Sequence, residues 1–251
     1  MIVYEYPFNE RIRAYLRLEY LLRRLETLLT RTEAIDHHFA IATLFEGMDV
    51  SSRSDLKSDV LKDLERHRQQ FNAYRASPDV NVAALDQIIG RIDEAHSRLR
   101  DQPTKPSQAL AENEWLMAIR NRMGIPGGTC TFDLPGYFAW QNQPPQQRHA
   151  DLLQWVQPFE PLANALYLLL RLFRDGGSPQ RIATVRGQYQ QNLPQNRTYQ
   201  LLRLTMPEHS PLIPEISGNR LMVSVRMLQK AEGGQLALAS DDGQYEMTLC
   251  M

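Results

Sequence analysis

Residues 119–135, IRNRMGIPGGTCTFDLP, bring together the residue types that most often build a reactive loop. They join the end of an amphipathic helix, stopped by Gly124, to a Pro-Gly-Gly turn, and a β-prone run at residues 129–133 follows. The spacing is not that of the phosphate loops GxxxxGK[ST] or GxGxxG, and a turn with positive φ explains the glycines. The segment also has no base and no partnered nucleophile. We therefore expect a binding scaffold rather than an enzyme.

In the rest of the chain, the residues that could bind a metal or act as a nucleophile do not have the spacing that such sites require. His37 and His38 are adjacent, so on a helix their side chains point about 100° apart, and we interpret them as the polar start of a helix. Cys130 and Cys250 have no CxxC partner, which argues against a zinc site. No GxSxG segment selects a catalytic Ser/His/Asp set. We predict no metal, no cofactor and no catalytic residue.

The composition is that of an ordinary globular protein of one large domain or two small ones. Lys and Arg number 28 against 29 Asp and Glu, so the net charge of −1 gives no general attraction to nucleic acid or membrane. The start of the chain lacks a secretory signal, and the most apolar stretch, residues 162–173, is shorter than the roughly 20 residues that span a bilayer. We expect a cytoplasmic protein with both thiols reduced; a disulfide between Cys130 and Cys250 is the alternative.

Helical periodicity dominates the first two-thirds of the chain. Asn9, Asp36, Ser54 and Asn81 each precede a periodic apolar run and are predicted helix N-caps. Further helices are expected at residues 109–123, from Pro144 onward, and at residues 162–174. The last of these is apolar on nearly every face, which predicts the buried centre of the helical part.

After the turn at residues 175–179 the apolar period changes to two. Strands are predicted at residues 199–206, 220–227, 236–239 and 245–251. In the second strand Leu221, Val223, Val225 and Met227 share the buried face, whereas Arg220, Ser224 and Arg226 share the wet one. The predicted fold class is α+β, with an α-helical domain at residues 1–177 and an antiparallel β domain at residues 178–251.

Arginines are the most informative charged residues. Most of them suit a solvated surface, and Glu19 beside Arg17 argues against a purely basic patch on the first helix. Arg220 and Arg226 differ, because two guanidinium groups on one sheet face suit the carboxylates of an acidic peptide.

Four blocks of the sequence together resemble the ZapD family of bacterial cell division proteins. They are LRLEYLLRRL at 16–25, the segment at 119–135, PLANALYLLLRLFR at 161–174 and PEISGNRLMVSVRM at 214–227. The resemblance runs nearly end to end. It implies a homodimer that binds the C-terminal tail of FtsZ, crosslinks FtsZ filaments into bundles and steadies the division ring at midcell.

The resemblance also implies that a basic surface receives the tail. The matching positions are Arg17, Arg53, Arg120, Arg122, Arg220 and Arg226. Glu114 and Met222 depart from the family pattern, because some relatives carry arginine there, so the pocket is less basic in this chain. The first helix and the helix at residues 56–74 are the expected dimer interface.

Two other classes of function compete with this interpretation. A nucleic-acid-binding regulator would use the same arginines, but the near-zero net charge and the few aromatic residues between them count against it. An enzyme would need a convergent polar pocket, which the sequence does not indicate.

Overall fold

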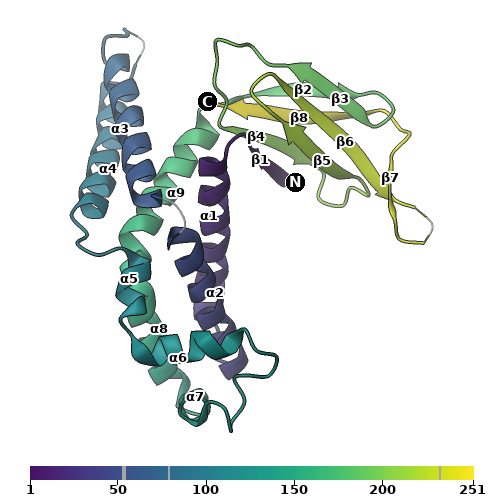
Figure 1. The fold of residues 1–251 in the computed structure, drawn as a ribbon. Coiled ribbons are helices and arrows are strands. Elements are labelled where there is room, and N and C mark those ends of the chain that lie inside the picture. The colour runs from purple at the N-terminus through teal and green to yellow at the C-terminus, as the bar shows by residue number, and fades with distance from the viewer. Residues whose placement is uncertain (53–54, 79, 232) are drawn as a thin grey trace. The chain divides into compact units, whose positions relative to one another are not determined.

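The computed structural model describes residues 1–52, 55–78, 80–231 and 233–251, and its fold class is α+β, as predicted (Figure 1). The chain divides into two compact units. The helical unit is Ala14–Leu169, and the β unit combines Met1–Arg13 with Leu170–Met251. The first and last helices therefore each contribute residues to both units. Each unit is described by itself.

The helical unit consists of helices joined by short connections. In chain order they are α1 (Glu10–Leu29), α2 (Ala34–Ser52), α3 (Leu56–Tyr74), α4 (Val82–Arg100), α5 (Pro106–Ala111), α6 (Glu114–Met123), α7 (Pro135–Gln141), α8 (Pro145–Val156), the 3₁₀ turn η1 (Gln157–Phe159) and α9 (Glu160–Asp175).

Two of the predicted N-caps are confirmed. The Asn9 side-chain oxygen accepts from the Ile12 N–H at 3.0 Å, and that of Asn81 accepts from the Ala84 N–H at 3.1 Å. The prediction for Asp36 was wrong, because α2 begins at Ala34 and Asp36 lies in its first turn. The predicted cap Ser54 lies outside the described residues.

The single helix predicted at residues 109–123 is two helices, α5 and α6. Asn113 separates them, and its side-chain oxygen accepts from the Leu116 N–H at 3.0 Å. An asparagine in extended backbone satisfies the first free N–H groups of a new helix, so it favours a restart over continuation. The restart gives α6 its own direction, and α6 carries two of the candidate arginines.

The core of the helical unit is built around α9, as its apolar sequence predicts. Leu162, Leu166 and Leu169 are each at most 3% exposed. The helix nevertheless keeps a polar side, where Asn164 is exposed. The Tyr167 hydroxyl donates to Glu26 of α1 at 2.8 Å.

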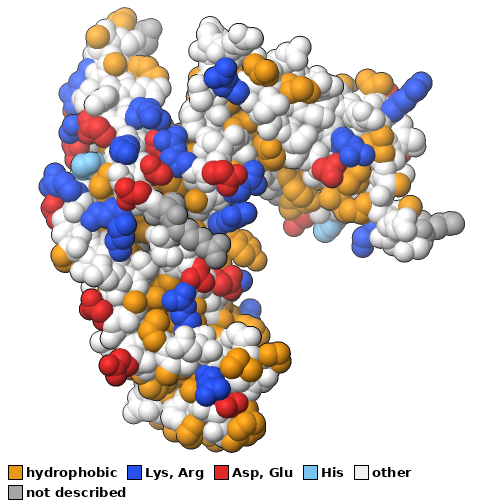
Figure 2. Space-filling view, viewed as in Figure 1, with side chains coloured by type: hydrophobic (Ala, Val, Ile, Leu, Met, Phe, Trp, Pro, Cys, Tyr) orange, Lys and Arg blue, Asp and Glu red, His pale blue; other side chains and the backbone are white. Residues whose placement is uncertain are grey.

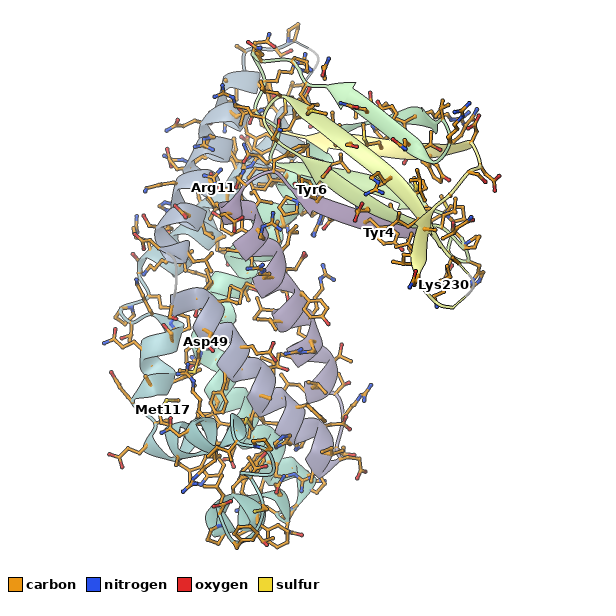
Figure 3. The ribbon with its side chains drawn as sticks, turned by 45° about the vertical axis from the view of Figure 1, so that its right-hand side comes forward. Tyr4, Tyr6, Arg11, Asp49, Met117 and Lys230 are labelled. Carbon is orange, nitrogen blue, oxygen red and sulfur yellow. The ribbon has the colours of Figure 1, made fainter. Side chains whose placement is uncertain are left out.

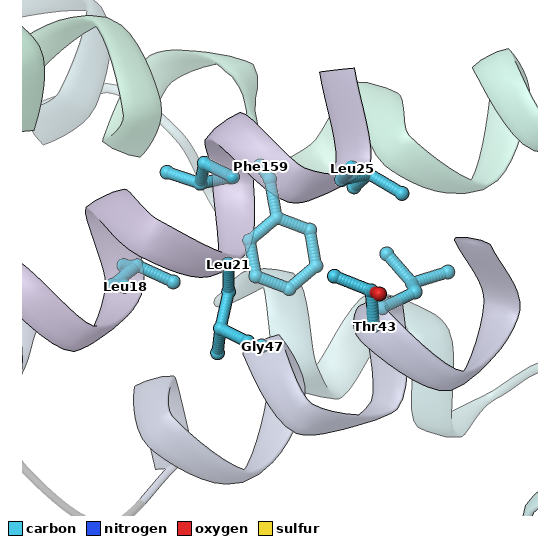
Figure 4. A pocket seen from close by; sticks show the side chains of 8 residues that line it. Leu18, Leu21, Leu25, Thr43, Gly47 and Phe159 are labelled. Carbon is cyan, nitrogen blue, oxygen red and sulfur yellow. The ribbon is translucent and has the colours of Figure 1, made fainter. Parts of the chain in front are cut away.

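A small void remains where α1, α2 and η1 meet (Figure 4). Its volume is about 10 Å³, and leucines of α1, Gly47 of α2 and the Phe159 ring line it. An apolar space of this size is at the lower limit for a single water, and its walls offer almost no hydrogen bonds. Gly47 faces the ring: a Cβ built there would lie 3.7 Å from Phe159 Cε1 and Cζ, an ordinary van der Waals contact.

The β unit contains two antiparallel sheets with a shared core. One has the strand order β1 (Ile2–Pro7), β4 (Leu201–Met206), β8 (Gly243–Cys250), β2 (Ser178–Thr184). The other has the order β3 (Gln188–Asn192), β6 (Met222–Lys230), β5 (Ile213–Gly218), and β7 (Leu236–Leu238) also pairs with β6. Tyr4 and Tyr6 project from β1 (Figure 3) and pack against this core. The Tyr6 hydroxyl donates a hydrogen bond to the Gly218 carbonyl at 3.0 Å.

The strands with clear alternation were predicted, with shifts of a few residues at their ends. Val223, Val225 and Met227 are fully buried on β6, as expected. Leu221 is instead 51% exposed, because β6 begins at Met222 and Leu221 lies with Arg220 in the bend before it. Arg220 is therefore not a strand residue, contrary to the prediction.

A shared carboxylate fixes β1 within the β unit. Glu5 accepts two hydrogen bonds from Arg174, at 2.8 and 2.7 Å, and one from Arg203 on β4 at 3.1 Å. All three side chains are less than one-third exposed. A two-pronged Arg–carboxylate contact fixes geometry as well as charge, so Glu5 ties the first strand to the end of α9.

We predict that Gly47→Ala stabilises the protein. Alanine is favoured over glycine in a helix interior by about 1 kcal/mol, and the added methyl group gains contact with Phe159 without a clash. The measurement is the free energy of unfolding from urea denaturation.

Gly90→Ala in α4 is the matched control, because a Cβ there meets nothing within 4 Å. It reports helix propensity alone, so we expect Gly47→Ala to gain at least as much. A loss of stability in Gly47→Ala alone would show that the Phe159 ring cannot accommodate the methyl group.

Candidate functional site

The segment between α6 and α7, residues 124–134, is a series of tight turns. The N–H groups of Gly128 and Cys130 donate to the carbonyl oxygens of Ile125 and Gly127 at 2.9 and 3.1 Å. The β run predicted at residues 129–133 was wrong, since none of the described strands pairs with this segment. Residues with high β-propensity form a strand only when a neighbouring strand provides backbone hydrogen bonds.

Two of the glycines of this segment, Gly127 and Gly128, are required for different reasons. Gly127 has φ +70°, the left-handed conformation that the sequence predicted for the turn. Gly128 instead lies close to the end of α6: a Cβ there would come within 2.4 Å of the Arg122 carbonyl oxygen. The sequence at this turn therefore sets the path by which the chain leaves α6.

A pocket of about 420 Å³ opens between this segment and α2. It is lined by His38, Ala42, residues 123–127 and Thr129. Apolar side chains gather over the segment and α7 (Figure 2), where Phe132 is 85% exposed and Phe138 is 47% exposed. Exposed apolar groups beside a pocket are typical of a surface that binds another molecule.

Arg120 and Arg122 end α6, where positive charge also complements the helix dipole. Each has an acidic neighbour within the helical unit. Arg120 pairs with Asp49, which projects from α2 toward α6 (Figure 3). Arg122 lies 3.6 Å from Asp133. An incoming carboxylate must therefore compete with a carboxylate that is already present.

The remaining candidate arginines also differ in whether a carboxylate of this chain lies beside them. Arg226 on β6 donates to Glu215 on β5 at 2.8 Å, and both side chains are about half exposed. Arg17 and Arg220 are exposed and make no ion pair with the residues that the structure describes. Arg53 lies outside the described residues.

The candidates therefore fall into three groups. Arg120 and Arg122 lie together on α6, and Arg17 lies on α1 in the same unit. Arg220 and Arg226 belong to the β unit, one before β6 and one within it. Among the candidate arginines that the structure describes, Arg17 and Arg220 are the two whose guanidinium groups have no carboxylate neighbour.

Arg148 is a buried charge of the helical unit that the sequence analysis did not single out. It is 5% exposed, and it donates to His37 Nδ1 at 3.1 Å and to the Thr32 and Gln141 carbonyls at 2.6 and 2.9 Å. The Gln143 carbonyl accepts a further hydrogen bond from it. Arg148 thus joins the α1–α2 connection, α2 and the α7–α8 connection.

Aromatic rings fill the space beside Arg148. Trp115 of α6, Tyr137 and Trp140 of α7 and Trp155 of α8 form this tryptophan cluster, with ring centroids 5.2–6.0 Å apart. The Tyr137 hydroxyl contacts His38 Nδ1 at 2.8 Å. Burial raises the pKa of Tyr137 and lowers that of His38, so both groups are neutral at pH 7. The cluster positions α7 and, through it, the segment at residues 124–134.

The two histidines lie near the start of α2, which begins at Ala34, but the predicted polar helix start was wrong for His37, which packs in the interior. His37 is fully buried against Arg148, and the described residues contain no group of three or more His, Cys, Asp or Glu that could hold a metal. Both cysteines are unpaired. Burial raises the pKa of the Cys250 thiol to about 11, which keeps it protonated and unreactive at neutral pH.

Comparison with known proteins identifies the family. The family model for ZapD, described as a cell division protein, matches residues 16–226. Two proteins named cell division protein ZapD, from Ralstonia pickettii (strain 12J) and Ralstonia nicotianae (strain ATCC BAA-1114 / GMI1000), are each 45% identical to this chain over 251 residues. These alignments cover 100% of this chain and 99% of each relative.

This chain belongs to the ZapD family. The resemblance inferred from the sequence is therefore confirmed, and with it a role in cell division and septation. ZapD is not a known enzyme family. Within the described ranges, no helix is long and apolar enough to cross a membrane.

We predict that Arg148→Lys destabilises this ZapD-family chain by about 2–4 kcal/mol. Lysine carries the same charge, but its three donors cannot reproduce the planar arrangement of contacts, and a buried charge that loses partners is costly. The measurement is the urea midpoint at constant m-value. Arg91→Lys on the exposed side of α4 is the control, expected within about 0.5 kcal/mol of the parent. Equal effects of the two substitutions would contradict a special role for Arg148.

Proposed function

We propose that this protein binds the C-terminal tail of FtsZ as a homodimer and crosslinks FtsZ filaments at the division site in the cytoplasm. Membership of the ZapD family over the full chain carries the proposal. The exposed arginines add a chemical rationale, because guanidinium groups bind carboxylates in a fixed, two-pronged geometry. No cofactor and no catalytic group is needed.

The charges also indicate how strongly each site binds. Arg120, Arg122 and Arg226 already have carboxylate neighbours. Exposed ion pairs contribute only about 0–1 kcal/mol each, so exchanging an internal partner for a tail carboxylate gains little. Arg220 and Arg17 have no such competitor among the described residues. We infer that each arginine contributes weakly to tail binding and that several contributions must add up.

Weak sites suit a crosslinking protein. A twofold dimer presents two equal sites, and filaments present many tails, so the combined affinity exceeds that of either site. A nucleic-acid-binding function has less support, because three of the five candidate arginines that the structure describes face carboxylates of this chain and the net charge is −1.

We predict that Arg220→Glu with Arg226→Glu abolishes binding of the FtsZ tail. The measurement is anisotropy of a fluorescent FtsZ C-terminal peptide across a salt series. Affinity of the parent protein should fall with salt, because the screening length is about 10 Å at 0.1 M. FtsZ bundling, followed by sedimentation, should be lost in parallel.

The matched control is Arg181→Glu with Arg197→Glu, which makes the same charge change at exposed positions of the same unit. Equal loss of binding in both double variants would mean that only net charge matters. Asp49→Asn tests the α6 arginines separately. Releasing Arg120 should raise tail affinity by up to about fivefold, the equivalent of 1 kcal/mol; no change would remove Arg120 from the site.

A further prediction concerns the dimer. Light scattering should give about twice the chain mass of 29.0 kDa at micromolar concentration. The Arg220→Glu, Arg226→Glu variant should keep that mass, because both residues belong to the β unit and lie outside α1 and α3, the expected dimer interface. A monomer mass for the parent protein would overturn the crosslinking mechanism.

A further inference from the structure

The hydrogen bonds around His37 admit only one protonation state. The Arg31 carbonyl lies 2.9 Å from His37 Nε2, and a carbonyl can only accept, so Nε2 carries a hydrogen. The Arg148 Nε–H lies 3.1 Å from Nδ1, and a guanidinium can only donate, so Nδ1 must carry a lone pair. A second proton on this ring would point directly at the Arg148 N–H.

The charges that face His37 also oppose its protonation. Arg148 and His149 approach from α8, and Asp36 lies on its own helix. Asp36 favours a positive ring, but it already pairs with Arg31 at 3.0 Å. Burial lowers the pKa of His37 most, and Arg148 and His149 lower it further. The hydrogen bond to the Arg31 carbonyl raises the pKa of His37, but the net direction is downward from the ordinary histidine value, so the ring is neutral at pH 7.

Loss of this contact would act on α7. Arg148 holds the end of α7 and the start of α8 through the carbonyls of Gln141 and Gln143. The ring of Trp140 on α7 lies 6.4 Å from the His37 ring, and its indole N–H donates to Asp151 of α8 at 2.8 Å. Arg148, His37 and the tryptophan cluster are therefore connected through a series of direct contacts.

We propose that His37 is an acid-sensitive lock on α7: the neutral ring holds Arg148 in place, and its protonation expels Arg148 and loosens α7 with the tryptophan cluster. The segment at residues 124–134 leads directly into α7, so it loosens as well. The lock is a property of the helical unit, and it holds whether or not the chain binds FtsZ.

Tryptophan fluorescence measures this event directly, because the chain has three tryptophans and all of them belong to the cluster. On acidification from pH 7 to pH 4.5 the emission maximum should shift to longer wavelength. The acrylamide quenching constant should rise at least twofold, while far-ultraviolet circular dichroism changes little. The emission maximum, and not the intensity, is the deciding measurement, because a protonated histidine can quench a nearby indole even when α7 stays in place.

His37→Asn is the decisive variant, because its amide oxygen can accept from Arg148 in place of Nδ1 and does not titrate. It should keep the emission maximum of pH 7 throughout. His67→Asn is the matched control: His67 is a second buried histidine, on α3, whose pKa is lowered to about 4. That variant should still show the shift, as should His38→Gln beside Tyr137.

A shift of parent size in His37→Asn, or its loss in His38→Gln alone, would overturn the lock. If His37→Asn does not fold, imidazole ¹⁵N resonances of the parent protein decide the question. Protonation of His37 with the same midpoint as the emission shift supports the proposal. A ring that stays neutral through the shift refutes it.

Discussion

The burial of one guanidinium determines how the end of the helical unit is built. Arg148 carries a positive charge, and no carboxylate is among its described partners, so backbone carbonyls and one imidazole nitrogen must satisfy it. These acceptors come from segments more than 100 residues apart. The charge can stay buried only while all of them remain in place, so the α1–α2 connection, α2 and α7 are ordered together.

This constraint reaches the surface through the aromatic rings. The tryptophan cluster packs between α6, α7 and α8, and the segment at residues 124–134 connects the first two of these helices. Its glycines permit the tight turns, but the rigid ends come from α6 and α7. The positions of the pocket beside His38 and of the arginines that end α6 therefore depend on Arg148, a buried charge that lies away from the surface.

The parts that could be predicted from the sequence are those with local signals. Asn9 and Asn81 act as caps within four residues of chain, and the alternation in β6 is visible in the sequence. β1 was not predicted, because its partner β4 lies about 200 residues later and only that pairing makes it a strand. β3, which is rich in glutamine, likewise becomes a strand only beside β6. Arg148 gives no local signal at all, since its environment is assembled from distant carbonyls.

The chain topology adds a consequence for how the proposed crosslinking protein is assembled. The helical unit is inserted between β1 and β2, which belong to the same sheet. β1 must therefore wait for β4 and β8, and closing so long a loop costs entropy before any sheet contact is gained. Glu5 offsets part of that cost, because it binds Arg174 at the end of the insertion and Arg203 on β4 at once. The β unit, which carries Arg220 and Arg226, is complete only after nearly the whole chain has been made. A truncation that removes β8 therefore removes the central partner of its sheet, and with it the support of β1.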